Sequence, residues 1–275
     1  MLWIFHKTKL PSLFEATDFL KPLVGVVAEQ PHPHLFVVVS GSHLYGFPSS
    51  DSDYDLRGVH ILPVQAVIAL DPPQETIELT TIRDDREIDL VTYDIRQFFA
   101  LLLKRNGHVL EQLYSPLVVH TTPAHGELKT IAQDCITRHH AYHYVGFAAS
   151  QWRLFEHHTP HRLKPLLYMY RVLLSGIHLM QTGQIEANLA TLNQVFQLSY
   201  LADLMAQKIE GHEQIALADA NLDFHRQEYQ RLYHWLETAS QASDLPDTPT
   251  AKPALNDLLV RLRLEPYQPG LSQTE

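Results

Sequence analysis

The chain has 275 residues, of which 45% are hydrophobic, so it can bury a substantial core in one large domain or two modest ones. Its formal net charge of -10 at pH 7 argues against sequence-independent adhesion to nucleic acid, which requires Lys and Arg to neutralise phosphates. The single cysteine, Cys135, excludes an intrachain disulfide, and no apolar run approaches the ~20 residues that span a bilayer, so we expect a cytoplasmic protein without membrane insertion.

Short β-rich runs separated by turn residues fill the chain before residue 95. They read "LFVVVS", "YDLRGVHIL", "ETIELTTI" and "EIDLVTYDI". Between the first two lies "SGSHLYGFPSSDS", which predicts a tight turn, one or two helical turns and a loop. The first part of the chain is therefore expected to contain a small β-sheet.

Helical periodicity dominates after residue 95. The segment "IRQFFALLLKRN" predicts an amphipathic helix that ends at Asn106 and Gly107, and "HVLEQLYS" predicts a second helix that ends before Pro116. Four long helical stretches follow from about residue 124, and "SDLPDTPTAKPALN" predicts a linker before a short last helix and a frayed tail. We divide this α+β chain into residues 1–120, a helical domain over 121–242, and a linker with a C-terminal tail over 243–275.

Three carboxylates in the β-rich part are candidate metal ligands. Asp53 and Asp55 occupy alternate residues at the start of a predicted strand, so their side chains share a face. Two such carboxylates repel unless a cation lies between them, and hard oxygen ligands suit Mg²⁺. A third carboxylate is expected if two ions are held, and we prefer Asp89, with Glu87 in reserve because strand register is uncertain by a residue or two. Asp51 is expected to be a turn residue.

The turn at Gly41 and Ser42 complements these carboxylates. It offers backbone N–H groups and a hydroxyl near a helix N-terminus, where phosphate oxygens are favoured. Alternatively, Gly41 only forms the turn and Ser42 only caps the following helix. Together with the acidic residues, this turn predicts a site for a metal-bound triphosphate.

Other polar residues allow two interpretations each. Arg57 either pairs with a ligand carboxylate or contacts substrate, and Lys164 and Arg171 either face a nucleotide or form a solvated helix face. Asn106 and Glu111 are expected to cap and connect two helices.

The histidine-rich segments "RHHAYHY" and "EHHTPHR" lack an acidic partner that would complete a zinc pattern. We expect their histidines to be exposed or partly packed, and to line an acceptor groove together with Trp152, Arg153 and Arg162.

The motif formed by "GS", ten intervening residues and "DYD", followed by an acidic residue on a later strand, resembles the signature of the DNA polymerase beta superfamily of nucleotidyltransferases. Within that superfamily, "GSHLYGFPSSDSDYDLRGV", "IDLVTYDIRQFF" and "LLLKRNGHVLEQLYSP" are similar to the branch associated with RNA repair. The resemblance is clear over roughly residues 34 to 116 and looser in the helical part. One departure is that the Asn-Pro often found in this branch reads Asn106-Gly107 here.

The resemblance implies a small mixed sheet in a catalytic domain over residues 1–120, followed by a helical domain that binds nucleotide or acceptor. It implies an enzyme that transfers a nucleoside monophosphate from an NTP to an acceptor hydroxyl, and the preferred NTP is ATP or CTP. Two Mg²⁺ ions would assist the transfer, and Mn²⁺ can substitute for them. Asp53, Asp55 and Asp89 would be the catalytic metal ligands, and the nucleotide-binding residues would be Gly41, Ser42, Arg57, Lys164 and Arg171.

The expected acceptor is the 3′ end of a tRNA-like RNA. Nucleotidylation of a protein, as in toxin–antitoxin systems, or of a small molecule is the alternative acceptor class. A nucleotide-binding sensor or scaffold is the alternative outside enzymes, and the complete set of acidic residues disfavours it.

Overall fold

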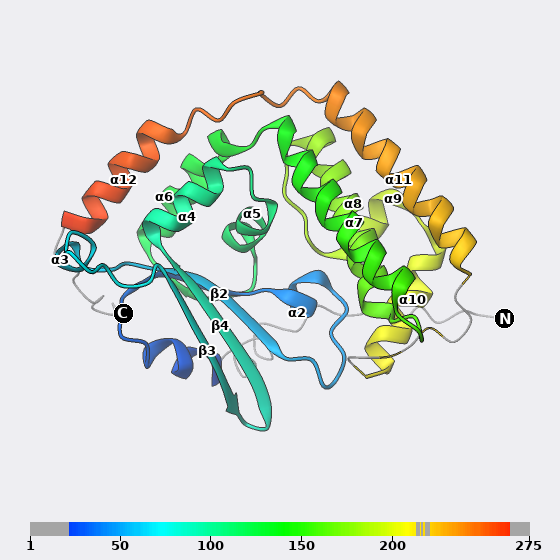
Figure 1. The fold of residues 1–275 in the computed structure, drawn as a ribbon, viewed down its shortest axis with the longest axis horizontal. Coiled ribbons are helices and arrows are strands. Elements are labelled where there is room, and N and C mark those ends of the chain that lie inside the picture. The colour runs from blue at the N-terminus through cyan, green and yellow to red at the C-terminus, as the bar shows by residue number, and fades with distance from the viewer. Residues whose placement is uncertain (1–21, 213–214, 216, 218–220, 265–275) are drawn as a thin grey trace, which may run out of the picture.

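The computed structural model describes residues 22–212, 215, 217 and 221–264 of the chain. A five-stranded mixed sheet with the strand order β3-β4-β2-β1-β5 lies beside a large group of helices (Figure 1). Its strands are β1 (His34–Val39), β2 (Tyr54–His60), β3 (Thr76–Arg83), β4 (Arg86–Asp94) and β5 (Val118–Thr121). Only β2 and β4 pair in parallel among these strands, whereas all the other neighbours pair antiparallel. The predicted α+β class and the mixed sheet are confirmed, and β5 is an addition that the sequence did not predict.

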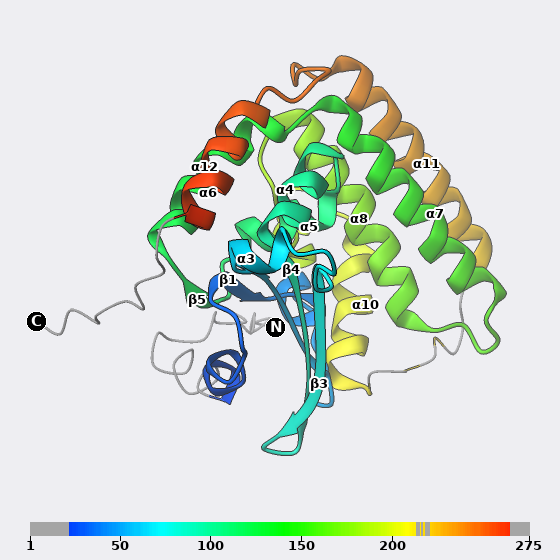
Figure 2. The same ribbon diagram turned by 60° about the vertical axis from the view of Figure 1, so that its left-hand side comes forward.

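Both faces of the sheet are covered, which explains why β1 is buried along its whole length. On one face, Val37 and Val39 pack with Leu23 and Val26 of the helical segment 22–28. On the other face, alternate residues of the same strand join the main hydrophobic core. Figure 2 shows β3 and β4 leaving the helices as a long hairpin.

The helices after the sheet are built around α8, most of which is buried, as its long run of apolar residues requires. The helices α7 and α11 pack along it (Figure 1). The helices are α2 (Gly41–Tyr45), α3 (Val64–Val67), α4 (Ile95–Leu103), α5 (Gly107–Tyr114), α6 (Pro123–Ala132), α7 (Ala141–His157), α8 (Leu163–Thr182), α9 (Leu189–Phe196), α10 (Ser199–Glu210), α11 (Leu222–Ala242) and α12 (Lys252–Leu264), with short 3₁₀ turns at Gln133–Cys135 and Arg138–His140. Within these helices, none is both long and apolar enough to cross a membrane.

Local capping follows the sequence at the junction of α4 and α5. The side chain of Asn106 accepts a hydrogen bond from the backbone N–H of His108 at 3.0 Å, so the predicted capping role of Asn106 is confirmed. Gly107 begins α5, and a Cβ atom at this position would lie 2.8 Å from Cδ2 of His143. The glycine therefore allows α5 to approach α7 closely.

The main hydrophobic core runs without interruption from the sheet into the helical part. It contains Phe36 and Leu110 from the first part of the chain together with Tyr144 and Leu174 from the helices. The boundary predicted after residue 120 falls inside β5. The two predicted domains consequently share one core.

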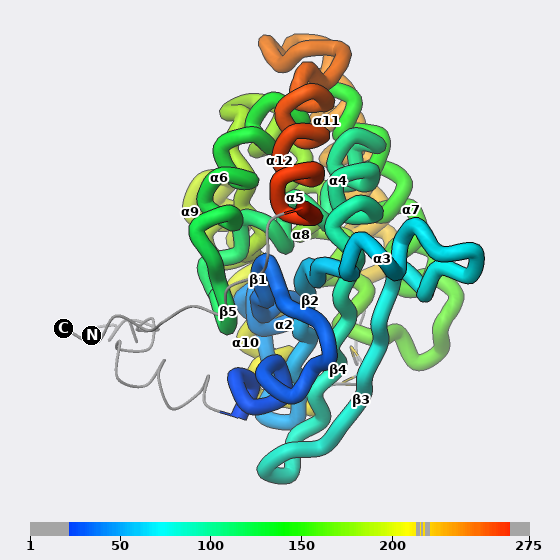
Figure 3. Tube along the Cα trace, turned by 90° about the vertical axis from the view of Figure 1, so that its left-hand side faces the viewer, coloured from blue at the N-terminus to red at the C-terminus, as the bar shows by residue number. Residues whose placement is uncertain are grey.

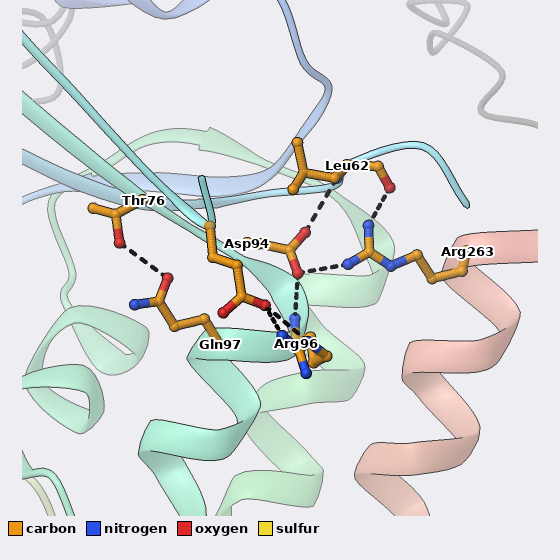
Figure 4. A network of polar contacts seen from close by, with 7 residues as sticks. Leu62, Thr76, Asp94, Arg96, Gln97 and Arg263 are labelled. Carbon is orange, nitrogen blue, oxygen red and sulfur yellow. Dashed lines mark hydrogen bonds and ion pairs between the residues drawn. The ribbon is translucent and has the colours of Figure 1, made fainter. Parts of the chain in front are cut away.

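The last described helix, α12, returns to the first part of the chain and packs against α4 and α6, as Figure 3 shows. Leu255 and Leu258 are buried there. The guanidinium of Arg263 donates to Oδ1 of Asp94 at 2.5 Å and to the carbonyl of Leu62 (Figure 4). Residues 265–275 of the predicted tail lie outside the described residues.

The pair of Arg263 and Asp94 generates a prediction for stability. Asp94 is fully buried, so Arg263→Met removes a charge-assisted bond to a carboxylate that cannot turn to water. We expect the free energy of unfolding in urea to fall by roughly 1.5–3 kcal/mol. Arg261→Met is the matched control, because Arg261 is on the same helix and pairs with the exposed acids Glu127 and Asp257. Equal effects of the two substitutions would contradict the prediction.

Candidate functional site

The parallel pairing of β2 with β4 sets Asp55 directly opposite Asp89. Residues paired in register on neighbouring strands carry their side chains on the same face, so the two carboxylates are neighbours. Asp53 lies just before β2 and two residues from Asp55. Glu87 instead pairs with Ile82 of β3. The register thus places Asp89, the preferred third acid, beside Asp55.

Arg57 lies between these two carboxylates. Its Nη2 donates to Oδ1 of Asp55 at 2.7 Å and contacts Oδ2 of Asp89 at 3.2 Å. Its Nη1 donates to the backbone carbonyls of Leu56 and Asp89, each at 2.8 Å. The guanidinium is therefore fixed on both strands. Of the two roles predicted for Arg57, carboxylate pairing and substrate contact, the structure contains the first.

Gly41 allows the turn after β1 to come against Asp55. A Cβ atom at Gly41 would lie 1.8 Å from Oδ2 of Asp55, and the φ of Gly41 is +59°. Both facts require glycine here. The backbone N–H of Ser40 also donates to the backbone carbonyl of Asp55 at 2.7 Å. The turn and the acidic strand are thus joined directly.

Ser42 lies inside α2, after its N-cap residue Ser40, so it is not the helix cap that the alternative interpretation proposed. Its side chain is 2% exposed, and its Oγ has no hydrogen-bond partner among the described residues. The hydroxyl is therefore an unsatisfied polar group close to the carboxylates.

The electrostatics of Asp55 connect the site to the helical part. Burial raises the pKa of Asp55, Arg57 opposes that rise, Asp53 and Asp89 add to it, and Lys164 lowers the pKa. Lys164 is the second residue of α8, and its ammonium lies 5.7 Å from the ring centroid of Tyr168. A cation from the helices thus acts on the acidic strand.

Arg171 has a different environment from the one predicted. It is fully buried, and its Nη1 donates to Oε1 of Glu111 at 2.8 Å. Its guanidinium lies 3.8 Å from the ring centroid of Tyr45, which belongs to α2. The solvated-face interpretation of Arg171 is therefore wrong, and its side chain has no exposed surface to offer a nucleotide. It packs instead on Tyr45 of the short helix that follows Gly41.

Glu111 likewise does more than connect two helices. Burial by itself would raise the pKa of Glu111, but the adjacent Arg171, together with His108, lowers that pKa to about 2. The carboxylate is thus ionised at neutral pH, and the ion pair is a charged contact inside the shared core.

Metal binding stays a prediction. In the described part of the chain, no three His, Cys, Asp or Glu side chains are grouped so that they could hold a metal ion. The histidine segments are consistent with packing, because His140 is buried and His143 meets His108 edge to face at 4.6 Å between ring centroids. Trp152 stacks on Tyr229 and is only 7% exposed, and its place in an acceptor groove stays a prediction.

Lys208 is a residue that sequence reasoning missed. It is fully buried, and its ammonium donates to Oγ of Ser49 at 2.8 Å, in the loop that leads to Asp53. A usable signal existed in α10, where Leu201, Leu204, Met205 and Lys208 follow the helical period i, i+3, i+4, i+7. A lysine on an apolar helix face must find a buried acceptor.

Comparison with known proteins identifies a family that matches most of the chain. The family described as RNA repair pathway DNA polymerase beta matches residues 17–261. An uncharacterized protein of Methanocaldococcus jannaschii is 32% identical over 157 residues, which are 57% of this chain and 64% of that protein. The uncharacterized protein YcgL of Bacillus subtilis is 27% identical over 143 residues, 51% of this chain and 54% of that protein. The matched regions thus span less than two thirds of either relative.

Among solved structures, a nucleotidyltransferase-like protein from Exiguobacterium sibiricum matches with 13% identity and a TM-score of 0.32, covering 93% of this chain and 82% of that one.

The contact of Gly41 with Asp55 predicts a coupled effect on stability. Gly41→Ala places a Cβ atom against the carboxylate, and the alanine must adopt the positive φ that the turn requires. We therefore expect the free energy of unfolding to fall by more than the ~1–2 kcal/mol of the backbone strain alone. In an Asp55→Ala background the same substitution should cost less, because the clashing oxygen is gone. Gly146→Ala is the control, since nothing lies within 4 Å of its added Cβ atom. Additive effects in urea unfolding would count against the contact.

The ion pair of Arg171 with Glu111 predicts a pH-dependent loss of stability. Glu111→Gln leaves a buried guanidinium uncompensated, so unfolding in urea at pH 7 should become easier by about 3–5 kcal/mol. Because the pKa of Glu111 is lowered from 4.5 to about 2, the contribution of its charge is fully present above pH 4.5 and is lost as the pH falls toward 2. The difference between wild type and variant should shrink over that interval.

A double variant gives the control for this pair. Glu111→Leu with Arg171→Met removes both charges and should destabilise much less than Glu111→Gln. A double variant as unstable as the sum of the two single variants would show that the charges do not interact.

Proposed function

Because the chain belongs to the RNA repair pathway DNA polymerase beta family, we propose that it transfers a nucleoside monophosphate from an NTP to an acceptor hydroxyl, with release of pyrophosphate. The observation that carries the proposal is the register of Asp55 with Asp89 on parallel strands, against the turn at Gly41. That arrangement gathers oxygen ligands beside a turn with backbone N–H groups, which is what a nucleoside triphosphate requires.

The donor chemistry fits Mg²⁺, with Mn²⁺ as a substitute. Asp53, Asp55 and Asp89 would hold the ions, which supply charge neutralisation for the triphosphate and activation of the acceptor hydroxyl. In the structure the charge of Arg57 already balances Asp55 and Asp89, which supports the view that this pair needs a cation. The contact to Asp89 is the longer of the two and would be the first to open.

The other residues of the proposal act on the nucleotide by charge and position. The backbone of Gly41 and the buried hydroxyl of Ser42 would meet phosphate oxygens, and Lys164 would add positive charge from the helical side. Arg57 would contact the same phosphates from its anchored position between the two acids. We propose ATP or CTP as the nucleotide.

For the acceptor we propose the 3′ end of a tRNA-like RNA. The family description supports an RNA substrate, and an RNA end supplies the free hydroxyl that the reaction needs. With a net charge of -10, the chain would contact such an end locally. Arg162, the N-cap residue of α8, and Arg153 of α7 are both exposed. Few neutralised phosphates mean a shallow dependence of binding on salt.

The test incubates the protein with each labelled NTP, Mg²⁺, and a mixture of total RNA and protein. We expect label on RNA, and we expect Asp89→Asn to lower the transfer rate by more than ~100-fold, since metal-held charge contributes several kcal/mol. Glu87→Gln is the matched control, because Glu87 is an exposed acid on the same strand and should leave the rate unchanged. Periodate oxidation of the RNA destroys a terminal cis-diol and should block labelling.

Other outcomes contradict parts of this proposal. Label on protein alone would replace the RNA acceptor by a protein hydroxyl, and equal labelling of oxidised RNA would exclude the 3′ end. NTP binding without transfer to any fraction would favour a nucleotide sensor.

A further inference from the structure

A fully buried lysine of the helical part anchors the loop between α2 and β2. Lys208 of α10 donates to Oγ of Ser49 at 2.8 Å, and Ser49 itself is buried. An ammonium group in the protein interior is costly unless acceptors surround it. The hydroxyl of Ser49 supplies one such acceptor.

Ser49 in turn is hydrogen-bonded to Ser52, the residue that precedes Asp53. Its N–H donates to Oγ of Ser52 at 3.0 Å, the two hydroxyl oxygens are 3.0 Å apart, and the N–H of Ser52 donates to the carbonyl of Ser49 at 3.1 Å. Ser52 is 2% exposed, and Asp53 follows it directly. The anchored turn thus ends where the acidic motif begins.

The helical part also holds the other end of the same segment. Arg171 lies over the ring of Tyr45, and Nδ2 of Asn188 donates to the carbonyl of Leu44 at 3.4 Å. Gly46 is shaped to this contact, since a Cβ atom there would lie 2.6 Å from Oδ1 of Asn188. The chain between the two halves of the motif is therefore fastened to the helices at both ends.

We propose that Lys208 is a positioning residue for the transfer reaction. By fixing the turn from Ser49 to Ser52, it sets the direction in which Asp53 leaves the loop and so brings that carboxylate toward Asp55. The inference rests on the proposed function, in which Asp53 holds a metal ion with Asp55 and Asp89. It makes the acidic site dependent on a helix whose lysine is 159 residues from Ser49 in sequence.

The test compares Lys208→Met, which keeps the length and removes the charge, with Lys208→Arg, which keeps a donor. For Lys208→Met we expect faster hydrogen exchange in residues 48–54 and Mn²⁺ binding weakened by ~10-fold or more in electron paramagnetic resonance titrations. The kcat should fall by ~10- to 100-fold with a small change in KM for the NTP, because orientation rather than nucleotide binding is lost. Lys208→Arg should recover part of each effect.

The control is Lys129→Met on α6, which changes a half-buried lysine outside the site. Where Lys208→Met does not fold, Ser49→Ala carries the test, because it removes the acceptor and leaves the lysine in place. Unchanged exchange and Mn²⁺ binding in a folded variant would overturn the role of Lys208. If the wild-type protein transfers no nucleotide, the proposed function fails, and the exchange and Mn²⁺ measurements still decide whether Lys208 positions the loop.

Discussion

The parallel pairing of β2 with β4 is the constraint on which the candidate site depends. It brings Asp55 and Asp89 side by side on a face that the helices partly cover, where burial raises the pKa of Asp55. Two neighbouring carboxylates in that position require positive charge, and Arg57 provides it from the same strand as Asp55. Hydrogen bonds from Arg57 to two backbone carbonyls hold the guanidinium within contact of both carboxylates.

Buried cations also join the helical part to the part of the chain that precedes it. Three cations that follow residue 121 reach groups that precede it: Arg171 pairs with Glu111, Lys208 with Ser49, and Arg263 with Asp94. Separating Arg171 from Glu111, or Arg263 from Asp94, would leave a buried carboxylate without its cation, which is far more costly than losing a surface pair. Together with the continuous core, the contacts hold the two parts in one relative position.

The segment from Gly41 to Asp53 joins the two halves of the motif, and groups from elsewhere in the chain hold it at several points. Gly41 lies against the side chain of Asp55, the ring of Tyr45 packs on the guanidinium of Arg171, and the hydroxyl of Ser49 accepts a hydrogen bond from Lys208. A segment of this kind gains its geometry from its surroundings, because α2 has only five residues and a helix so short is not stable alone. Substitutions in the helices are therefore expected to affect the site without touching it.

The sequence by itself determined the elements and the chemistry of the motif. Alternation in "DYD", the apolar run of β1 and the capping residue Asn106 are local properties, because backbone periodicity and a side chain's reach over three residues do not depend on distant parts of the chain. Only the tertiary structure decided that Asp89 rather than Glu87 faces Asp55, that Arg171 is buried, and that Lys208 reaches Ser49. Strand register and helix packing bring together residues that are far apart in sequence, and a single residue of slip or a rotation of one helix would choose different neighbours while leaving every local pattern unchanged.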